Sequence, residues 1–492
     1  MTNQQPEIGI SGLAAYLPPY RVDLERWCAW SGDSWDKIAN VVGASYRLPG
    51  PTENAYTMAA TAVLRLLDQY DVEADRIGFL GLGTESSTDN SAGAVIVKGM
   101  VNEALMSQGR PTISRNCEVP EFKHACLGGV YAMKAAARYL ALDGQDRLAI
   151  VVCSDIAEYE RGTSGEPTQG AGAVAMLVEA NPKLLTIELG TSGTSSDYRG
   201  PDFRKPLSRF TNQTPTRYAQ PRDYPLFNGK YSTTCYIDEV LAATADLKNK
   251  LEGSGKKFLR DMRAVFLHRP YQRMAETGLA MMLLYLLAVG DAEDRAELVE
   301  IAASSGVDAN TLTTELVAQP YVFDLVGQQT LSQELYPTAT QALRAMRKLP
   351  LWQTDIADKL VLGAAEMKQV GNLYTASLPA WLAAGLQEAH RQGLSLSDER
   401  ILTVGYGSGD AAEIIPMRVV NGWEDAAARI HFAETLATAP VDLSESDYQN
   451  LHDNGELAVA APPRSGAFHI SRIGARDGQF DDSGLEYYEY IA

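Results

Sequence analysis

Short, continuously apolar runs alternate with helical patterns along this chain, and that alternation limits its fold more than any other feature. The runs at residues 77–83 and 148–154 lack the polar alternation of a half-exposed strand. Residues 54–69 precede the first run with apolar residues at helical spacing, and the Ala-rich residues 128–142 precede the second. Strands that are apolar on both faces need helices on both sides of their sheet. The sequence therefore predicts a layered α/β fold.

The second half of the chain repeats this order of elements. Residues 264–267 and 401–406 are predicted strands, and residues 378–389 have a helical pattern. The repetition predicts a fold made of two duplicated halves, which we place at residues 1–186 and 187–492. Residues 291–350 are mostly helical in pattern and acidic, which indicates a helical insertion in the second half. The C-terminal end, LEYYEYIA, is rich in aromatic residues and is expected to pack against the protein.

The charge balance excludes one large class of partner. The formal net charge is −19 and the isoelectric point is about 4.8, so no broad basic surface is available for a nucleic acid. The five cysteines contain no CxxC pair and are too few for a disulfide framework in 492 residues. The N-terminus does not resemble a signal peptide, and the most apolar run, residues 278–290, is too short to span a bilayer. We therefore predict a cytoplasmic protein with no membrane partner.

Cys126 is the candidate nucleophile. It lies in the segment KHACLGGVYAMKAAARYLA, just before a pair of glycines and an Ala-rich helix. At a helix N-terminus the helix dipole and free N–H groups favour a thiolate, lower the pKa of the thiol and can bind an oxyanion. The alternative is a buried structural cysteine. Cys153, inside an apolar strand, is interpreted in that second way.

Glu85 and His268 each follow a predicted strand. Glu85 comes after Gly-rich backbone, where burial would raise the pKa of its carboxyl and let it act as a general acid/base. The alternative is an exposed loop glutamate. His268 precedes a chain-turning Pro270, and its neutral imidazole could bind a carbonyl or move a proton; the alternative is a core histidine. The histidines on polar helices or tails are expected at the surface: His390, His431, His452 and His469.

Two glycine-containing segments have the character of site loops. Residues 370–375 (VGNLYT) place the amide of Asn372 before a helix. Residues 405–410 (GYGSGD) form a strand and turn whose bare backbone is expected to approach another part of the chain. The second segment is not a dinucleotide-binding pattern, because no helix that opens with GxGxxG follows it.

Taken in order, these segments resemble the hydroxymethylglutaryl-CoA (HMG-CoA) synthase family of the thiolase superfamily, its bacterial form most of all. The resemblance rests on GTES at Glu85, ExKxAC ending at Cys126, and the long block SDIAEYERGTSGEPTQGAGAVAM at residues 154–176. It continues with NGKYSTTCYIDE from residue 228, HRPYQRM from His268, VGNLYTAS from residue 370 and GYGSGDAAE from residue 405. These motifs cover most of residues 7–480, with the weakest stretch at 291–350.

This resemblance implies the five-layered αβαβα thiolase fold, a homodimer, and the condensation of acetyl-CoA with acetoacetyl-CoA to HMG-CoA and CoA, as in the mevalonate pathway of isoprenoid biosynthesis. Cys126 would carry the acetyl group as a thioester. Glu85 would remove a proton from the acetyl methyl group, and His268 would polarise the acetoacetyl ketone. The backbone of Cys126 and Ser408 would form the oxyanion hole. No metal or redox cofactor is implied, and CoA is the handle of the substrates.

Further positions follow from the same resemblance. Asn372 would assist His268, and the residues expected to line the substrate site are Tyr159, Thr168, Phe203 and Tyr374. Arg273 stands where the family often has lysine and, with Arg269, is a candidate ligand for the CoA phosphates. Leu127 replaces an aromatic residue often found after the nucleophile, which is expected to change the shape of the acyl pocket.

Two other functions are compatible with these residues. A synthase of the same type could act on β-ketoacyl groups bound to an acyl-carrier protein in polyketide β-branching, and basic residues beside the tunnel mouth would favour it. A non-catalytic thiolase-fold scaffold is the second alternative. A scaffold has no physical need to keep Cys126, Glu85, His268 and Asn372, so the enzyme is favoured. The sequence leaves open whether CoA or a carrier protein holds the substrate.

Overall fold

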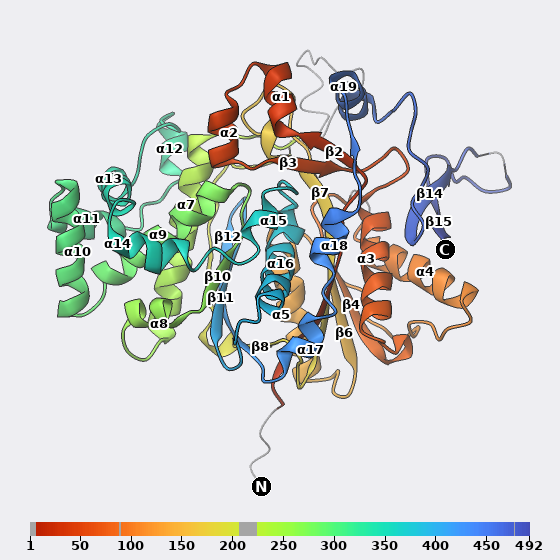
Figure 1. Ribbon diagram of the computed structural model, residues 1–492, viewed down its shortest axis with the longest axis horizontal. Helices are drawn as coiled ribbons and strands as arrows, with labels where there is room; N and C mark the ends of the chain where they lie inside the picture. Colours follow the sequence, from red (N-terminus) through yellow and green to blue (C-terminus); the bar gives the residue numbers. More distant parts are fainter. Residues whose placement is uncertain (1–5, 88–89, 206–223, 477) are drawn as a thin grey trace, which may run out of the picture.

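A ten-stranded sheet runs through the centre of the protein in the computed structural model, which describes residues 6–87, 90–205, 224–476 and 478–492 (Figure 1). The strand order is β10-β11-β12-β8-β1-β7-β6-β4-β5, and β9 pairs with β12. The strands are β1 (Ile8–Tyr16), β4 (Ile77–Gly83), β5 (Glu121–Phe122), β6 (Leu148–Ala157), β7 (Gly170–Ala180), β8 (Leu185–Ile187), β9 (Gly193–Ser196), β10 (Ala264–Leu267), β11 (Arg400–Gly407) and β12 (Ala411–Val419).

The central strands are buried on both faces, as their apolar runs predicted. Every residue of β4 is buried, and so is every residue of β6 except Ile156. The predicted helices flank them as α3 (Ala55–Gln69) and α5 (Gly128–Ala141). Asn54 starts α3, because its side chain accepts hydrogen bonds from two backbone N–H groups of the first turn.

The strand order repeats between the two halves. β6 pairs parallel with β4 and antiparallel with β7, which is antiparallel to β1. In the second half β11 pairs parallel with β10 and antiparallel with β12, which is antiparallel to β8. β1 and β8 pair with each other and join the two sets. This pattern is expected of a duplicated fold, and it would start the second half at β8, the strand that contains the predicted boundary between residues 186 and 187.

Helices cover the sheet in three layers (Figure 1). On one outer side α3 packs on β1, β6 and β7, next to α4 (Gly93–Ser107). On the other outer side α7 (Lys230–Lys250) packs on β9 and β12, next to α9 (Gln272–Ala288). Between them α5 contacts β4 and β6, and α16 (Ser377–Arg391) contacts β10 and β11. The two ends of the sheet, one with β6 and β7 and the other with β11 and β12, thus alternate with three helical layers. This arrangement confirms the predicted five-layered α/β fold.

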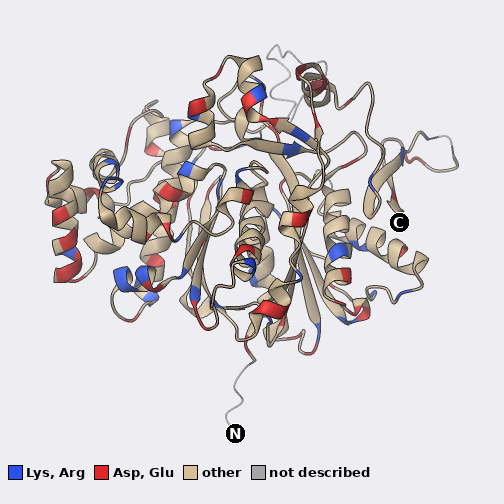
Figure 2. Cartoon of the chain, viewed as in Figure 1, with Lys and Arg blue, Asp and Glu red and all other residues tan. Residues whose placement is uncertain are grey.

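The predicted insertion is helical and packs on α9 at one end of the molecule (Figure 1). Figure 2 shows its outer helix α10 as a strongly acidic element. Its helices are α10 (Ala292–Ser305), α11 (Ala309–Val317), α12 (Asp324–Gly327), α13 (Pro337–Met346) and α14 (Pro350–Trp352). The apolar run at residues 278–290 forms the buried second half of α9. Within the described ranges, no helix combines the length and apolar character needed to cross a membrane.

Smaller elements close the remaining surfaces. The C-terminal hairpin packs on α3, with the rings of Phe468 and Tyr490 5.0 Å apart, so the aromatic tail packs as predicted. A three-stranded sheet, β13-β2-β3, lies above the main sheet with α1, α2 and α19 (Figure 1). The helices and strands of these surfaces, together with four short helices elsewhere on the protein, are α1 (Leu24–Ser31), α2 (Trp35–Val41), α8 (Gly255–Asp261), α15 (Ala364–Met367), α17 (Trp423–Ala427), α18 (Phe432–Ala437), α19 (Glu445–Asn454), β2 (Tyr20–Asp23), β3 (Ser45–Leu48), β13 (Val441–Asp442), β14 (Ala467–Ile473) and β15 (Glu486–Ile491).

Candidate active site

One narrow cavity collects side chains from segments that lie far apart in the sequence. It is lined from the first half by the Cys126 segment and the loops that follow β6, and from the second half by the ends of β10 and β11. The predicted site residues that line it are Cys126, Tyr159, Thr168, Phe203, His268, Asn372 and Ser408. Tyr374 is buried against Cys126 and Tyr159 in the same apolar cluster, although it does not line the cavity itself.

Cys126 lies directly before α5, as predicted, and the following glycines explain how it gets there. Leu127 is the N-cap of α5. A Cβ on Gly129 would lie 2.2 Å from the Sγ of Cys153, and one on Gly83 would lie 2.4 Å from the backbone N of Gly129. Only bare backbone lets the helix begin this close to the ends of β4 and β6. The glycine pair therefore sets the position of the nucleophile.

Replacing Gly129 by alanine is expected to lower the free energy of unfolding by about 1–3 kcal/mol, because the new methyl group overlaps Cys153. The double variant with Cys153→Ala should recover part of that loss, since it removes the overlapping sulfur. Denaturant unfolding measures both. Gly99→Ala, in an exposed part of α4 with nothing near the new methyl group, is the matched control and should be neutral or stabilising. Equal losses in both single variants would contradict the close-packing explanation.

The glycines of β11 bring Ser408 beside the nucleophile. A Cβ on Gly407 would lie 2.5 Å from the carbonyl oxygen of His124, and one on Gly405 would lie 2.7 Å from Leu127. The bare backbone predicted at residues 405–410 therefore packs on the Cys126 segment. Leu127 is fully buried in this contact and does not line the cavity, so its effect on the shape of the acyl pocket stays a prediction and would act through the segment that carries Ser408.

Asp155 holds the loop that carries Glu85. This fully buried carboxyl accepts hydrogen bonds from the backbone N–H groups of Glu85 at 2.8 Å and Ser86 at 3.0 Å through Oδ1. Its Oδ2 accepts from the backbone N–H of Thr375 at 2.9 Å. One side chain thus ties the Glu85 loop to the segment that contains Asn372. No sequence motif singles out Asp155, because its partners are too distant in the chain.

The pKa of Cys126 corrects the sequence-based expectation. Burial, followed by the negative charges of Glu85 and Asp155, raises the pKa of the Cys126 thiol well above its usual value. These effects outweigh the helix N-terminus, which had predicted a lowered pKa. Glu85 is partly exposed and is not among the residues that line the cavity, but its negative charge acts on the Cys126 thiol. The free protein therefore holds a neutral thiol at neutral pH.

Alkylation of Cys126 should follow this raised pKa. With iodoacetamide and no substrate, the rate is expected to rise about tenfold per pH unit from pH 7 to 9 without a plateau, because the thiolate fraction rises in that proportion. Mass spectrometry of the peptide that contains Cys126 gives the rate at each pH. A plateau below pH 8 would show instead that the helix N-terminus dominates.

His268 presents a neutral imidazole to the cavity. Its side chain is 2% exposed, and burial lowers the pKa of the ring to about 3. Within the described residues Nδ1 has no protein hydrogen-bond partner. The ring centroid lies 6.4 Å from that of Tyr406, and the two ring planes meet at 28°. A neutral ring, held by packing and lacking a partner at Nδ1, suits hydrogen bonding with a substrate.

Asn372 has its amide orientation fixed by its neighbours. Its Oδ1 accepts from the backbone N–H of Tyr374 at 2.9 Å and from the hydroxyl of Ser377 at 3.1 Å. Nδ2 is therefore the group that remains as a donor, and it lies 3.5 Å from the hydroxyl of Tyr159. Tyr374 adopts a φ of +45°, which turns the chain sharply after Asn372.

Aromatic rings form the acyl side of the cavity. The ring of Tyr159 packs edge-on against Phe203 at 5.8 Å, Phe227 at 6.2 Å and Tyr374 at 6.2 Å. Phe227, with Ser232 and Met274, also lines the cavity and was not predicted. These rings exclude water from the space beside Cys126, which strengthens polar contacts there.

His452 is part of this wall and not of the surface, so that prediction was wrong. It is 2% exposed, and its Nε2 lies 2.9 Å from the carbonyl oxygen of Tyr159 and 3.1 Å from Oε1 of Gln169. Helix α19, polar in sequence, is docked so that its histidine supports the backbone that carries Tyr159.

A wider cleft lies outside the cavity and shares part of its lining. Thr168, Phe227 and Tyr271 border both spaces, and Trp27, Trp30, Lys37 and Arg161 line the outer one. Its position suits the arm of a thioester that reaches Cys126 from outside.

The two arginines proposed for CoA phosphates lie in different surroundings. Arg273 lines a separate cavity together with Arg344 and Arg347 of the insertion. Arg269 is 3% exposed, its guanidinium lies 4.9 Å from the ring centroid of Trp381, and burial lowers its pKa to about 10. Its burial favours a structural role over contact with a phosphate.

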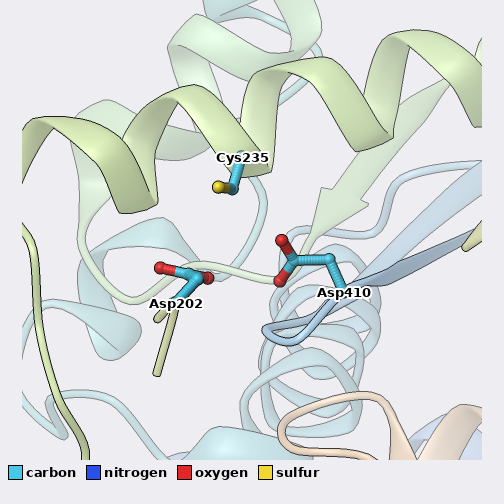
Figure 3. Close-up of side chains that lie close together, drawn as sticks. All are labelled: Asp202, Cys235 and Asp410. Atoms are coloured by element: carbon cyan, nitrogen blue, oxygen red, sulfur yellow. The ribbon is translucent and has the colours of Figure 1, made fainter. Parts of the chain in front are cut away.

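Among the described residues, one group has ligand atoms close enough to consider a metal ion: Asp202, Cys235 and Asp410, which lie within 4.8 Å of one another (Figure 3). Arg199 already supplies a fixed positive charge, with Nε 3.7 Å from Oδ2 of Asp410. We therefore assign no metal to this cluster, and the absence of a metal cofactor stays a prediction.

Comparisons with known proteins agree on one family. Residues 4–183 match the family model described as hydroxymethylglutaryl-coenzyme A synthase N terminal, and residues 219–445 match the corresponding C terminal model. Hydroxymethylglutaryl-CoA synthase of Haloferax volcanii is 26% identical over 454 residues, 91% of each chain. The solved structure of MvaS in complex with 3-hydroxy-3-methylglutaryl coenzyme A superposes with a TM-score of 0.74 at 26% identity, covering 99% of this chain and 100% of that one. The curacin pathway HMG synthase with holo donor-ACP shares the fold, with a TM-score of 0.69, 18% identity and coverage of 99% and 100%.

Proposed function

The chain belongs to the hydroxymethylglutaryl-CoA synthase family of acyl-transferring condensing enzymes, and from this premise we propose that it condenses acetyl-CoA with acetoacetyl-CoA and releases HMG-CoA and CoA. The observation that supports this most directly is the cavity in which Cys126, His268, Asn372 and Ser408 meet. The electrostatic effect of Glu85 on the Cys126 thiol adds the carboxylate that carbon–carbon bond formation requires. An acyl carrier and a polarising imidazole thus line one small space, and the proposed base acts on the acyl carrier through its charge.

Acetylation of Cys126 comes first. Its sulfur attacks the thioester carbonyl of acetyl-CoA, the bond from that carbonyl to the CoA sulfur breaks, and the thiol proton ends on the departing CoA. Because no net charge is created, a thiol that is neutral in the free enzyme suits this step. The negative charge that develops on the carbonyl oxygen would be stabilised by the backbone N–H groups of Cys126 and Ser408, two residues that line the same cavity.

Condensation and hydrolysis follow. Glu85 removes a proton from the methyl group of the acetyl thioester, and the resulting carbanion attacks the ketone carbon of acetoacetyl-CoA. Neutral His268, aided by the Asn372 amide, binds the ketone oxygen, which Glu85 then protonates. Water finally cleaves the bond between the acyl group and Cys126, which yields the new carboxylate and regenerates the thiol.

The partners in this proposal are small molecules. The outer cleft would hold the CoA arm. Arg273 remains the candidate for the CoA phosphates, although it lines a separate cavity, in which Arg347 is paired with Glu276 at 2.9 Å. The scheme uses no metal or redox cofactor. We also propose a homodimer, as the family resemblance implies, and a cytoplasmic location, which the five unpaired cysteines favour.

A direct assay tests the proposal. The purified protein is mixed with acetyl-CoA and acetoacetyl-CoA, and free CoA and HMG-CoA are followed by chromatography. Formation of both products at equal rates is expected. If carrier-bound acetyl and acetoacetyl groups are converted and the CoA thioesters are not, the carrier-protein function replaces this one. If the protein turns over neither pair, the scaffold interpretation replaces both.

A further inference from the structure

Two buried carboxyl groups lie behind the wall of the cavity, and the proposed reaction does not use them. Asp202 is 1% exposed and Asp410 is 2% exposed. Figure 3 shows their carboxyl groups facing each other below the thiol of Cys235. The hydroxyl oxygen of Tyr406 lies 2.9 Å from Oδ1 of Asp410 and 3.3 Å from Oδ2 of Asp202. A hydroxyl carries one proton, so it can donate to only one of the two carboxyls at a time.

Carboxyl groups outnumber positive charges at this place. In the described part of the chain Arg199 is the one guanidinium among them, and its Nη2 is taken by Asp238 at 2.5 Å and Glu239 at 2.6 Å. Its Nε lies 3.7 Å from Oδ2 of Asp410, which is too long for a hydrogen bond. Two neighbouring buried carboxyls that face one shared positive charge do not both ionise readily, so a proton is retained between them.

Asp410 also closes the turn that carries Ser408. Its Oδ1 accepts hydrogen bonds from the hydroxyl of Tyr406 and from the backbone N–H of Gly409, one on either side of Ser408. The backbone of Asp410 exchanges two hydrogen bonds of 3.1 Å with that of Asp197. Tyr406 and Ser408 both line the cavity. A change of charge at Asp410 therefore acts on the wall that faces Cys126.

We propose that Asp202 and Asp410 share one proton at neutral pH and act as a positioning pair that keeps Ser408 in place against the acyl group. The role of Ser408 rests on the proposed function, whereas the shared proton does not. Burial and the charge of Asp202 raise the pKa of Asp410 to about 9, and burial also raises the pKa of Asp202. Above that pH the two anions repel each other, Asp410 and the turn that it closes shift away from Asp202, and condensation slows.

The other groups around the pair do not produce the same signal. The charged or titratable groups that face it are Cys126, Asp197, Arg199, Tyr231, Cys235, Asp238, Glu239, His268 and Tyr406. Burial raises the pKa of Cys126, Tyr231, Cys235 and Tyr406 and lowers the pKa of His268 to about 3, so none of these changes charge between pH 5 and 8. The remaining groups are common to the wild type and the Asp410 variant, so their titration cancels in a comparison.

The first test measures stability and needs no activity. In Asp410→Asn the amide keeps the acceptor for Tyr406 and Gly409 but cannot ionise. Between pH 5 and 8 the native pair holds a proton that the unfolded chain has lost, so stability of the wild type falls as the pH rises. Its unfolding constant is expected to increase about tenfold per pH unit relative to that of Asp410→Asn. A ratio that stays constant over this range overturns the proposal.

The second test measures the alkaline limb of condensation. Each protein is assayed from pH 7 to 10 and normalised to its own rate at pH 7. The wild type should lose activity around pH 9, Asp410→Asn should lack this loss, and the control Asp197→Asn, which keeps the pair, should show it. Superimposed wild-type and Asp410→Asn profiles overturn the positioning role even if the shared proton is found. Tight Zn²⁺ binding by EDTA-treated wild type that Asp410→Asn loses also overturns the proposal, because a cation would then replace the proton.

Discussion

Replacing Cys126 by alanine is expected to abolish acetyl labelling from acetyl-CoA and to reduce HMG-CoA formation to the background rate. The sulfur is the one atom in the scheme that bonds covalently to the substrate, and no other cysteine lines the cavity in the described part of the chain. Without it the acetyl group has no carrier, so the loss includes both half-reactions. Radiolabelled acetyl-CoA followed by acid precipitation measures the first half-reaction, and chromatography measures the overall one.

Cys153→Ala is the matched control for this experiment. Cys153 is also buried and lies against the start of α5, next to Gly129, but its thiol faces the core instead of the cavity. This variant should label with acetyl groups and condense the substrates, at the cost of some stability. If the acetyl label persisted in Cys126→Ala and was lost in Cys153→Ala, the nucleophile would be Cys153 and not Cys126.

The parts of the fold that the sequence predicted are those whose signal is local. The apolar runs of β4 and β6 and the helical spacing of α3 and α5 depend on neighbouring residues only, so they were found. The candidate nucleophile was placed correctly before α5 for the same reason. The motifs that carried the family resemblance then supplied His268, Asn372 and Ser408, which the structure brings to the same cavity as Cys126.

The parts that the sequence could not predict depend on contacts between distant segments. The pKa of Cys126 is set by its burial and by Glu85 and Asp155, and these outweigh the local helix N-terminus. Asp155 could not be recognised because the backbone N–H of Thr375 that it binds is 220 residues away. His452 was assigned to the surface because α19 is polar, whereas docking on Tyr159 buries it. Each error came from long-range packing that a local pattern does not contain.

Glu85 provides the second large effect, and it should separate the two half-reactions. In Glu85→Gln the amide cannot accept the methyl proton, so condensation should fall by about 10²–10⁴-fold, whereas the acetyl–Cys126 thioester should still form. Removal of the negative charge should also lower the pKa of the Cys126 thiol, because Glu85 is one of the causes that raise it. The variant should therefore react faster with iodoacetamide at pH 8 than the wild type does.

Three measurements on one variant decide the role of Glu85: acetyl labelling, HMG-CoA formation and the rate of Cys126 alkylation. Glu103→Gln, an exposed position on α4, is the matched control and should leave all three unchanged. If Glu85→Gln lost acetyl labelling together with condensation, Glu85 would act in the first half-reaction and the assignment above would fail. If it kept both while alkylation accelerated, Glu85 would tune the thiol without moving the methyl proton. If Glu85 is the general base, we expect the remaining combination: the acetyl-enzyme accumulates, alkylation of the unacetylated thiol is faster, and the carbon–carbon bond is not made.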